Sequence, residues 1–475
     1  MTPGRSASGA PDLVIDIDPE YDLDPGFIDE WRRSPMCPRS GHLTFITGYH
    51  EGSQVLRSRS FRTNRFTAEG TNPVYVVVGD DRSVRFADPD ADGNLPAGAV
   101  DWATVIAGGD TLSSLHGEPH RQRRRALSAL FGRNSHQWYR ETVIDPVIRR
   151  NLQAALDTAG ADGVVRLDLV PFAHRLFVQL TAKLVGLDGV ETAEGADDLA
   201  ELFERMHASA GLTVPREGLT EKGMTDSLWA RDEFKERYFD PSRAVRAELV
   251  ARYERGELAE AELPRDYLTL VARGADTFDT EASVFNQTFP LFNGSTGTST
   301  SMVLHTLDNL LTWFEQHPGD RARQNDPEFL QRALRETIRL QNPGLPAITR
   351  MAIEDVELPS GRRFAAGDVV NLLLPATNRD PSVFAEKADE FDLGRTVPSG
   401  VHDYALGFGG GVHMCPATPL VLGEGGISGT VVPAVAALLE AGIERDRPEG
   451  DVRRPAATDP FEPPLAVFPA RLHRR

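Results

Sequence analysis

The most constraining feature of this chain is the glycine-rich run from Phe408 to Cys415, which ends in a cysteine. Its three consecutive glycines let the backbone approach a flat ligand closely, and the residues after the cysteine predict a helix. The other cysteine is Cys37, so we do not expect a disulfide framework. Zinc would need three or four ligands at short spacing, and the run offers one histidine and one cysteine. A thiolate that is the lone axial ligand of haem iron needs only one cysteine. The alternative for this run is a glycine turn with a buried structural cysteine.

The run resembles the haem-thiolate loop of the cytochrome P450 family, whose pattern is Phe-Gly-x-Gly-x-His-x-Cys-x-Gly. The positions that match are Phe408, Gly409, Gly411, His413 and Cys415. Ala417 stands where the family has its last glycine. The resemblance implies that Cys415 is the axial ligand of haem b. It also implies a mainly α fold with small β-sheets, in which a triangular prism of helices surrounds the haem.

Composition limits the class of protein and its partners. The chain has 475 residues, of which 40% are hydrophobic and 25% charged, as in soluble globular proteins. A net charge of -19 argues against nucleic acid and anionic membranes as main partners. No apolar run approaches the length of a membrane span, and the N-terminus lacks the apolar core of a signal peptide. With so few cysteines, these features favour a cytoplasmic protein.

The expected organisation is a flexible tail over residues 1–23 followed by one domain over residues 24–475. The tail is rich in Pro, Gly, Asp and Ser. We expect a single domain because motifs far apart in the sequence must converge on one cofactor. Residues 70–105 form an atypical insert, in which Val74–Val78 and Val84–Phe86 predict a hairpin with a Gly/Asp turn.

Helical periodicity dominates from His120 onward. The predicted helices are Glu51–Arg57, Arg121–Phe131, Val143–Leu156, Asp197–Ala208, Arg231–Arg255, Glu281–Glu315, Glu328–Leu340 and Val431–Glu440. The predicted strands outside the insert are His42–Thr47, Val356–Leu358, Val369–Leu374 and Leu465–Phe468. Gly160–Leu169 and Pro215–Gly223 are predicted loops.

A glutamate and an arginine share one face of the helix that precedes the cysteine loop. Glu336 and Arg339 are spaced i, i+3, which by itself is a common helical ion pair. The pair resembles the family's Glu-x-x-Arg motif, which implies a structural role beside the haem. In the family a third basic residue completes this network, but here the corresponding segment, Ala388–Phe391, has none. Another group must therefore balance the buried pair, or Glu390 faces away.

The resemblance also implies four residues that bind the haem propionates. They are His120, Arg124, Arg350 and His413. Cations suit this role because the propionates are anionic and partly buried. Further arginines, at 121, 123 and 125, lie off the face of His120 and Arg124. They form either a solvated surface or a docking patch for an acidic electron-transfer protein.

The long helix Glu281–Glu315 departs from the family pattern. In the family, a small-Gly-x-acid-Thr sequence delivers protons during oxygen activation. Here no acidic residue occurs between Glu281 and Asp308. Aligning Gly297 with the motif glycine places Ser299 at the acid position and Thr300 at the alcohol. Aligning Gly294 instead places Thr296 at the acid position and Gly297 at the alcohol. The first register needs the smaller insertion before His317–Pro318, which resembles the family's turn, so we prefer it and the relay residues Gly297, Ser299 and Thr300.

Pro416 is a second departure, because it offers no amide N–H toward the sulfur of the preceding cysteine. One fewer hydrogen bond would make the thiolate more electron-rich and lower the reduction potential of the iron.

The resemblance implies a haem-thiolate monooxygenase that oxidises a small, partly apolar molecule, with electrons from a ferredoxin or flavin-type donor. The substrate would contact Asp101–Leu115, Leu202–Leu219, the long helix and Leu345–Ile348. The missing acid leaves open a peroxide-driven enzyme, or one that closes rings or couples substrates without inserting oxygen. A non-enzymatic haem-thiolate sensor is a further alternative. The insert suggests a natural product as substrate, which the motifs cannot name.

Overall fold

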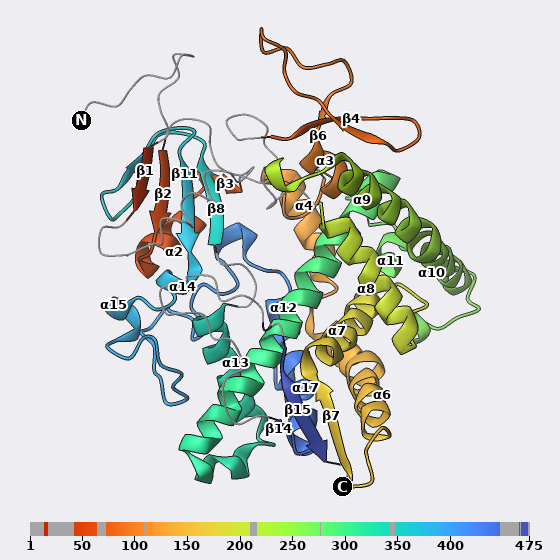
Figure 1. Cartoon of the computed structure of the whole chain (residues 1–475), viewed down its shortest axis with the longest axis vertical. Coiled ribbons are helices and arrows are strands. Elements are labelled where there is room, and N and C mark those ends of the chain that lie inside the picture. The colour runs from red at the N-terminus through yellow and green to blue at the C-terminus, as the bar shows by residue number, and fades with distance from the viewer. Residues whose placement is uncertain are drawn as a thin grey trace.

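The computed structural model describes residues 14–17, 42–63, 73–108, 110–209, 216–275, 277–342, 347–446, 465 and 467–473. Helices dominate these residues, and the strands form small sheets, as the sequence predicts. Figure 1 shows one part that carries the largest sheet and a second part built of helices. The helix α12 (Glu281–Gln316) runs between the two parts. Cys37 lies outside the described residues.

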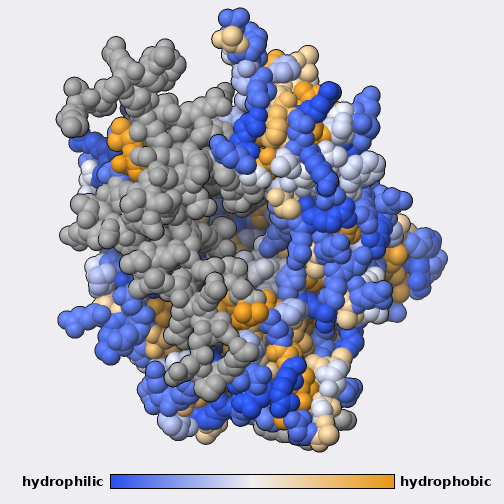
Figure 2. Space-filling model, viewed as in Figure 1, coloured by the Kyte–Doolittle hydropathy of each residue, from blue (hydrophilic) through white to orange (hydrophobic). Residues whose placement is uncertain are grey.

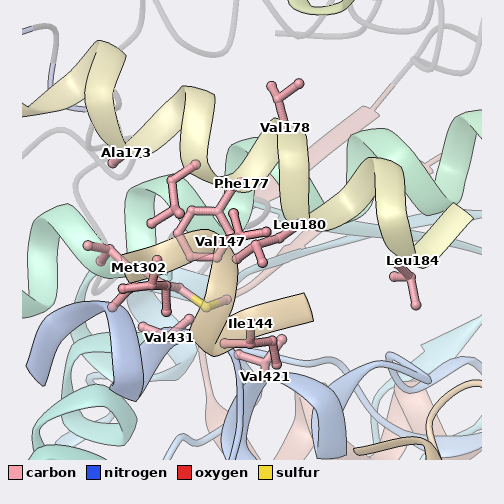
Figure 3. Packing of buried hydrophobic residues seen from close by; sticks show 14 of the residues in the cluster. Ile144, Val147, Ala173, Phe177, Val178, Leu180, Leu184, Met302, Val421 and Val431 are labelled. Atoms are coloured by element: carbon pink, nitrogen blue, oxygen red, sulfur yellow. The ribbon is translucent and has the colours of Figure 1, made fainter. Parts of the chain in front are cut away.

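The 36-residue helix α12 is the central element of the fold. It begins in a capping box, in which Thr280 accepts from the Ser283 amide and the Ser283 hydroxyl lies near the Thr280 amide. Helix α7 (Leu169–Val185) packs along it. Figure 3 shows how Phe177 of α7 and Met302 of α12 meet in the largest apolar core. This buried packing fixes the position of α12, whose other face borders the candidate site.

The remaining helices surround α12. They are α2 (Tyr49–Arg57), α3 (Trp102–Ala107), α4 (Gly117–Ser128), α5 (Arg133–Tyr139), α6 (Asp145–Leu156), α8 (Ala193–His207), α9 (Glu221–Phe234), α10 (Asp240–Glu254), α11 (Tyr267–Ala272), α13 (Pro327–Gln341), α14 (Leu374–Thr377), α15 (Pro381–Phe384), α16 (Thr418–Leu422) and α17 (Val431–Glu440). None of the helices in the described ranges is both long and apolar enough to span a lipid bilayer.

The largest sheet has five strands in the order β1-β2-β11-β8-β3. Its strands are β1 (Val14–Ile17), β2 (His42–Ile46), β3 (Phe61–Thr63), β8 (Ala347–Ala352) and β11 (Val369–Leu373). β1 and β11 pair parallel with β2, and β8 pairs antiparallel with β11 and β3. Part of the predicted N-terminal tail is therefore a strand, because the β-branched, apolar residues Val14, Ile15 and Ile17 favour extended backbone and the segment adds to a sheet edge.

The other sheets have two or three strands. They are formed by β4 (Tyr75–Val78), β5 (Val84–Phe86) and β6 (Val100–Asp101), by β7 (Val164–Asp168), β14 (Glu444–Arg445) and β15 (Pro469–His473), by β9 (Val356–Glu357) and β10 (Arg363–Phe364), and by β12 (Gly423–Glu424) and β13 (Ile427–Ser428). The strand β7 corrects the prediction of a loop over Gly160–Leu169, since residues 164–168 pair with β15. The terminal strand lies at Pro469–His473 and not at the predicted Leu465–Phe468.

Two helical stretches contain a π turn, and one of them lies inside a helix that the sequence predicts as continuous. The predicted Arg231–Arg255 helix is α9 and α10 joined by a π segment at Lys235–Phe239, and a similar segment at Arg140–Ile144 joins α5 to α6. Each π segment is followed by a proline in the first turn of the next helix, Pro241 or Pro146. Proline cannot donate the i to i−4 hydrogen bond, and a wider turn before it avoids the clash.

The predicted hairpin in the insert is confirmed, and a third strand joins it. We call the β5-β4-β6 sheet the insert sheet. Its apolar residues pack with α3 and α9 around Trp102, Met224 and Leu228. The Val84 amide donates to Thr225 Oγ1 over 3.0 Å and the Phe86 amide to Glu221 Oε1 over 2.9 Å, both in α9. The insert is thus attached to α9 by backbone hydrogen bonds as well as by an apolar core.

A glycine-rich hairpin interrupts the helix that follows Cys415. Helix α16 has five residues, and β12 and β13 separate it from α17. A Cβ atom at Gly423 would lie 2.2 Å from the carbonyl oxygen of Ile427, and one at Gly429 would lie 2.0 Å from that of Val421. Only glycine fits at these two positions.

Candidate functional site

The loop that carries Cys415 is closed on itself and packed against α2. The Cys415 amide donates to the Phe408 carbonyl over 2.9 Å, and Gly409 and Gly411 have φ values of 71° and 63°. A Cβ atom at Gly411 would lie 2.1 Å from the carbonyl oxygen of Leu56 in α2. The backbone conformation and the contact with α2 therefore both require glycine at 411. Glycine at position 411 is thus required by the fold itself, in addition to the close approach of a ligand that the sequence predicts.

Cys415 is a free cysteine that is partly buried. Burial raises the pKa of its thiol, while the Ala417 amide, the charge of Arg124 and the Thr418 side chain and amide act in the opposite direction. Pro416 supplies no amide, but the two residues after it do. Hydrogen-bond donors and a nearby cation are what a buried thiolate needs, so this cysteine suits a metal ligand.

The four predicted propionate residues come from three segments of the chain. α4 supplies His120 and Arg124, β8 supplies Arg350, and the cysteine loop supplies His413. Arg124 Nη1 donates to the Met414 carbonyl over 2.7 Å, and the rings of His120 and His413 have centroids 4.2 Å apart. The charge of Arg350 acts on His413. The fold therefore brings this predicted set together beside the cysteine loop.

These groups form a basic cluster that fits an anionic ligand. Burial, followed by the charge of Arg124, lowers the pKa of His120 to about 4. Burial, followed by the charges of His120 and Arg350, lowers the pKa of His413 to about 3. His120 Nε2 is buried without a hydrogen-bond partner, and Arg124 has no carboxylate partner within the described ranges. Two carboxylates placed here would satisfy the free donor and balance the guanidinium charge, so the residues fit the propionates of a haem.

His116 is a member of this cluster that sequence reasoning did not select. Its ring lies 5.4 Å from that of His413, and its Nε2 is 3.2 Å from Thr63 Oγ1 of β3. Burial lowers its pKa, and the charges of Arg62 and Arg350 add to this effect. The signal was present in the sequence, because His116 precedes His120 by four residues, the spacing of one helical face.

The ion pair of Glu336 and Arg339 is buried and has a third, basic member. Arg339 donates to both carboxylate oxygens of Glu336 over 2.8 Å. Arg395 Nε donates to Glu336 Oε1 over 3.0 Å, and both arginine side chains are less than a tenth exposed. Arg395 thus supplies the cation that segment 388–391 lacks. Glu390 contributes its carbonyl to both arginines, while its side chain pairs outward with Lys387.

One face of α12 is open in its middle. Gly294 and Gly297 are exposed, and a Cβ atom at either would meet no atom within 4 Å. Thr298 is half-buried beside them, and its hydroxyl donates to the Gly294 carbonyl over 2.7 Å. Ser299 and Thr300 are buried, and the Thr300 hydroxyl donates to the Thr296 carbonyl over 2.8 Å.

The open face carries Gly297, and Thr298 is the half-buried hydroxyl beside it. Ser299 and Thr300 are less exposed than Thr298. If Thr298 took the alcohol position, Gly297 would stand at the position of the missing acid, a register that neither sequence alignment included. The prediction of Ser299 and Thr300 as relay residues stays a prediction.

The predicted basic docking patch is smaller than expected. Arg123 is buried and donates to the carbonyls of Asp110 and Thr277, so it cannot be part of a surface. Arg121 and Arg125 are exposed, and Arg121 pairs with Glu118.

An aromatic cluster lies between α8, α9 and α12. The Phe203 ring stacks on Phe292 with centroids 3.9 Å apart, and Phe234 and Phe289 pack beside them. Arg231 of α9 donates to Asn286 of α12 over 2.6 Å. Of the predicted substrate segment Leu345–Ile348, only its last two residues are described. Figure 2 shows the surface hollowed near its centre, between the sheet-bearing part and the helices.

Comparison with protein families finds a match to the family described as cytochrome P450 over residues 270–420. The matched segment runs from α11 to α16 and includes Glu336, Arg339, Arg350 and Cys415. Helix α12 with its open face is also inside it.

Curated relatives include a linalool 8-monooxygenase of Pseudomonas putida, 32% identical over 257 residues, which are 54% of this chain and 55% of that enzyme. The chain thus aligns with about half the length of that relative. A biotin biosynthesis cytochrome P450 of Bacillus subtilis is 26% identical over 384 residues, 79% of this chain and 78% of that protein. Among solved structures, CalO2 has a TM-score of 0.62 at 21% identity, covering 97% of this chain and 100% of that one. The structural likeness concerns the fold.

Proposed function

Because this chain belongs to the cytochrome P450 family, we propose that it is a haem-thiolate monooxygenase acting on a small, partly apolar organic molecule. The observation that carries the proposal is the free, partly buried thiol of Cys415 beside a basic cluster in which His120 Nε2 is buried without a partner. A structural cysteine would need neither the cluster nor the open face on α12.

The chain's own residues divide the binding of haem b between them. Cys415 would provide the axial sulfur, and His120, Arg124, Arg350 and His413 would bind the propionates. When bound, the haem supplies an iron centre that uses dioxygen and two electrons to oxidise an organic substrate. Glu336 and Arg339 hold the helix α13 behind the cysteine loop and do not touch the ligand.

Proton delivery in this chain depends on hydroxyl groups. Thr298 is the hydroxyl on the open face of α12, and Thr300 and Ser299 lie behind it. We assign the relay to Thr298 with ordered water, and keep Thr300 as the competing residue. A hydroxyl that donates to a carbonyl of its own helix can rotate to pass a proton onward.

The substrate side favours an apolar molecule. The rings of Phe203, Phe289 and Phe292 pack together where α8 meets α12, and the insert sheet carries a further apolar cluster. One curated relative is a mycinamicin IV hydroxylase/epoxidase of Micromonospora griseorubida. This similarity supports a role in bacterial secondary metabolism.

A ferredoxin or flavin-type protein would provide the electrons. Arg121 and Arg125 are the exposed arginines of α4, on the helix that contacts the cysteine loop through Arg124. They offer positive charge to an acidic donor in a chain that is otherwise strongly acidic.

The absence of an acid on α12 favours a second candidate. The chain would use peroxide, or catalyse ring closure or coupling without oxygen insertion. Product analysis with peroxide alone, and with ferredoxin, reductase and NADPH, separates the candidates. Turnover only with the electron donors and with labelled oxygen in the product supports the monooxygenase.

The first experiment tests the cofactor. Purified protein that is reduced and exposed to carbon monoxide should show the strongly red-shifted Soret band of thiolate-bound ferrous haem. The Cys415→Ser variant should lose that band while keeping its far-ultraviolet circular dichroism. If the band is absent in the native chain, or survives in Cys415→Ser, the proposal is wrong.

A further inference from the structure

An amide of α12 is held in one orientation by a histidine of α8. His207 is the last residue of α8, and its Nδ1 lies 2.7 Å from the Phe203 carbonyl. A carbonyl cannot donate, so Nδ1 carries the proton. Its Nε2 contacts Nδ2 of Asn293. In the neutral ring Nε2 has only a lone pair, so the Asn293 amide donates to it and cannot turn over without losing this bond.

The pair of His207 and Asn293 lies at the edge of the contact between α8 and α12, where solvent can reach it. His207 is exposed, yet the surrounding protein desolvates its ring and lowers its pKa. Asn293 is half-buried and precedes Gly297 by four residues, so both border the open face of α12. The Asn293 side chain is thus about one helical turn, ~5–6 Å, from the glycine that faces the proposed reaction centre.

The amide oxygen of Asn293 is left without a partner. Within the described ranges it accepts no hydrogen bond. Asn286 lies two turns earlier on the same face and provides a contrast, since its Oδ1 accepts from Arg231 over 2.6 Å. The Phe203 ring stacks beside the His207 ring, with centroids 6.2 Å apart. The Asn293 oxygen is thus a fixed acceptor next to an apolar ring and open to a donor from a ligand.

We propose that Asn293 is a specificity-determining residue that accepts a hydrogen bond from a hydroxyl or N–H group of the substrate, with His207 as its positioning residue. The substrate class is therefore an apolar skeleton that carries a hydrogen-bond donor about one helical turn away from the atom that is oxidised. This inference rests on the proposed function, because it takes the open face of α12 as the substrate side.

The test uses ligands that bind haem iron whatever the natural substrate is. Imidazoles with 1-alkyl chains of increasing length are compared with matched chains that end in a hydroxyl or a methyl ether. Dissociation constants come from the Soret shift of the ferric holoprotein. At one chain length the hydroxyl probe should bind about threefold to tenfold more tightly than the ether, the effect of one buried hydrogen bond.

Substitutions test whether Asn293 and His207 cause the preference for the hydroxyl probe. Asn293→Leu should abolish the preference, while Ser295→Ala on the same helix should keep it. His207→Leu frees the amide and should weaken the preference, and His207→Gln, which can still accept from Nδ2, should restore much of it.

Two results would overturn the inference. Either the hydroxyl probe binds no better than the ether at any length, or its advantage survives in Asn293→Leu. A purified protein with no Soret shift for any imidazole would instead overturn the proposed function, and the inference with it.

Discussion

At the scale of single residues, burial decides what each polar side chain can do. Thr298 and Thr300 are two positions apart, yet one borders the open face of α12 and the other is 6% exposed. Arg123 and Arg125 differ in the same way on α4. Sequence motifs locate such residues to within one helical turn, and the packing of the folded chain determines which of them is exposed.

The assignment of the proton relay predicts unequal effects of two threonine substitutions. In electron-driven turnover, Thr298→Ala should release about ten times more hydrogen peroxide per substrate oxidised, since a positioned proton donor is worth tenfold or more. Thr300→Ala should change this ratio by less than about twofold, because its hydroxyl bonds inside the core. Peroxide and product are measured together. The reverse order would return the relay to Thr300.

The buried network around Glu336 predicts a large cost for removing its third member. Arg395→Ala leaves one of the Glu336 oxygens with fewer donors and should lower the free energy of unfolding by about 3–5 kcal/mol. Arg363→Ala is the matched control, because its pair with Glu357 is exposed, and it should change stability by less than about 1 kcal/mol. Urea unfolding followed by circular dichroism measures both. Equal effects would contradict the buried role of Arg395.

His136 on α5 predicts a dependence of stability on pH. It is 2% exposed, neither ring nitrogen has a hydrogen-bond partner, and burial lowers its pKa. Its folded-state pKa lies below the unfolded value of about 6.5, so the unfolded state binds more protons and stability falls as pH drops below about 6.5. His136→Phe should remove this loss, which melting temperatures at pH 8 and pH 5.5 would reveal. If the melting temperatures of the variant and the parent differ by the same amount at both pH values, His136 is not the cause of the pH dependence.

At the scale of elements, the sequence could predict those helices and strands in which apolar and polar residues alternate with a regular period. The amphipathic helix α13 was predicted within a residue or two, and so was the hairpin of the insert. Helix α7 was not predicted, because it is buried on most sides and lacks a polar face. The strand β7 was read as a loop because its partner β15 is some 300 residues away in the chain. Local patterns cannot report such a distant pairing.

The attachment of the insert sheet to α9 predicts a local effect of one hydroxyl. Thr225→Val removes the acceptor of the Val84 amide, so that amide should exchange with solvent about tenfold faster, equivalent to about 1.4 kcal/mol. Hydrogen–deuterium exchange over residues 73–101 measures this. Lys222→Ala, an exposed change on the same helix, should leave the exchange unaltered. If both variants behave alike, the bond does not hold the insert.

At the scale of the whole molecule, the site lies where distant segments meet. The basic cluster joins α4, β3, β8 and the cysteine loop, and α12 runs through the centre of the fold. The motifs identified Cys415 and most of this cluster from the sequence. Arg395 could not be assigned, because its partners are fixed only by the folded chain, whereas the spacing of His116 from His120 was visible in the sequence.

Such a site predicts that the cofactor stabilises the molecule. Binding of a ligand to the folded state alone adds about 4 kcal/mol at a concentration of 1,000 times its dissociation constant. Removal of haem should therefore lower the melting temperature, and readdition should restore it. Differential scanning calorimetry of both forms tests this. His120→Ala should reduce the difference in melting temperature between the haem-bound and haem-free forms. An unchanged difference would argue against a role of His120 in haem binding.

The hairpin of Gly423 and Gly429 has a consequence for engineering of this chain. Backbone atoms fill the space that any side chain there would occupy, and α16 lies between this hairpin and Cys415. A designer who varies the outer surface for solubility would meet two sites where even alanine forces the backbone of the hairpin to shift. Tolerance of substitution in this region is thus determined by close backbone contacts and not by distance from the candidate site.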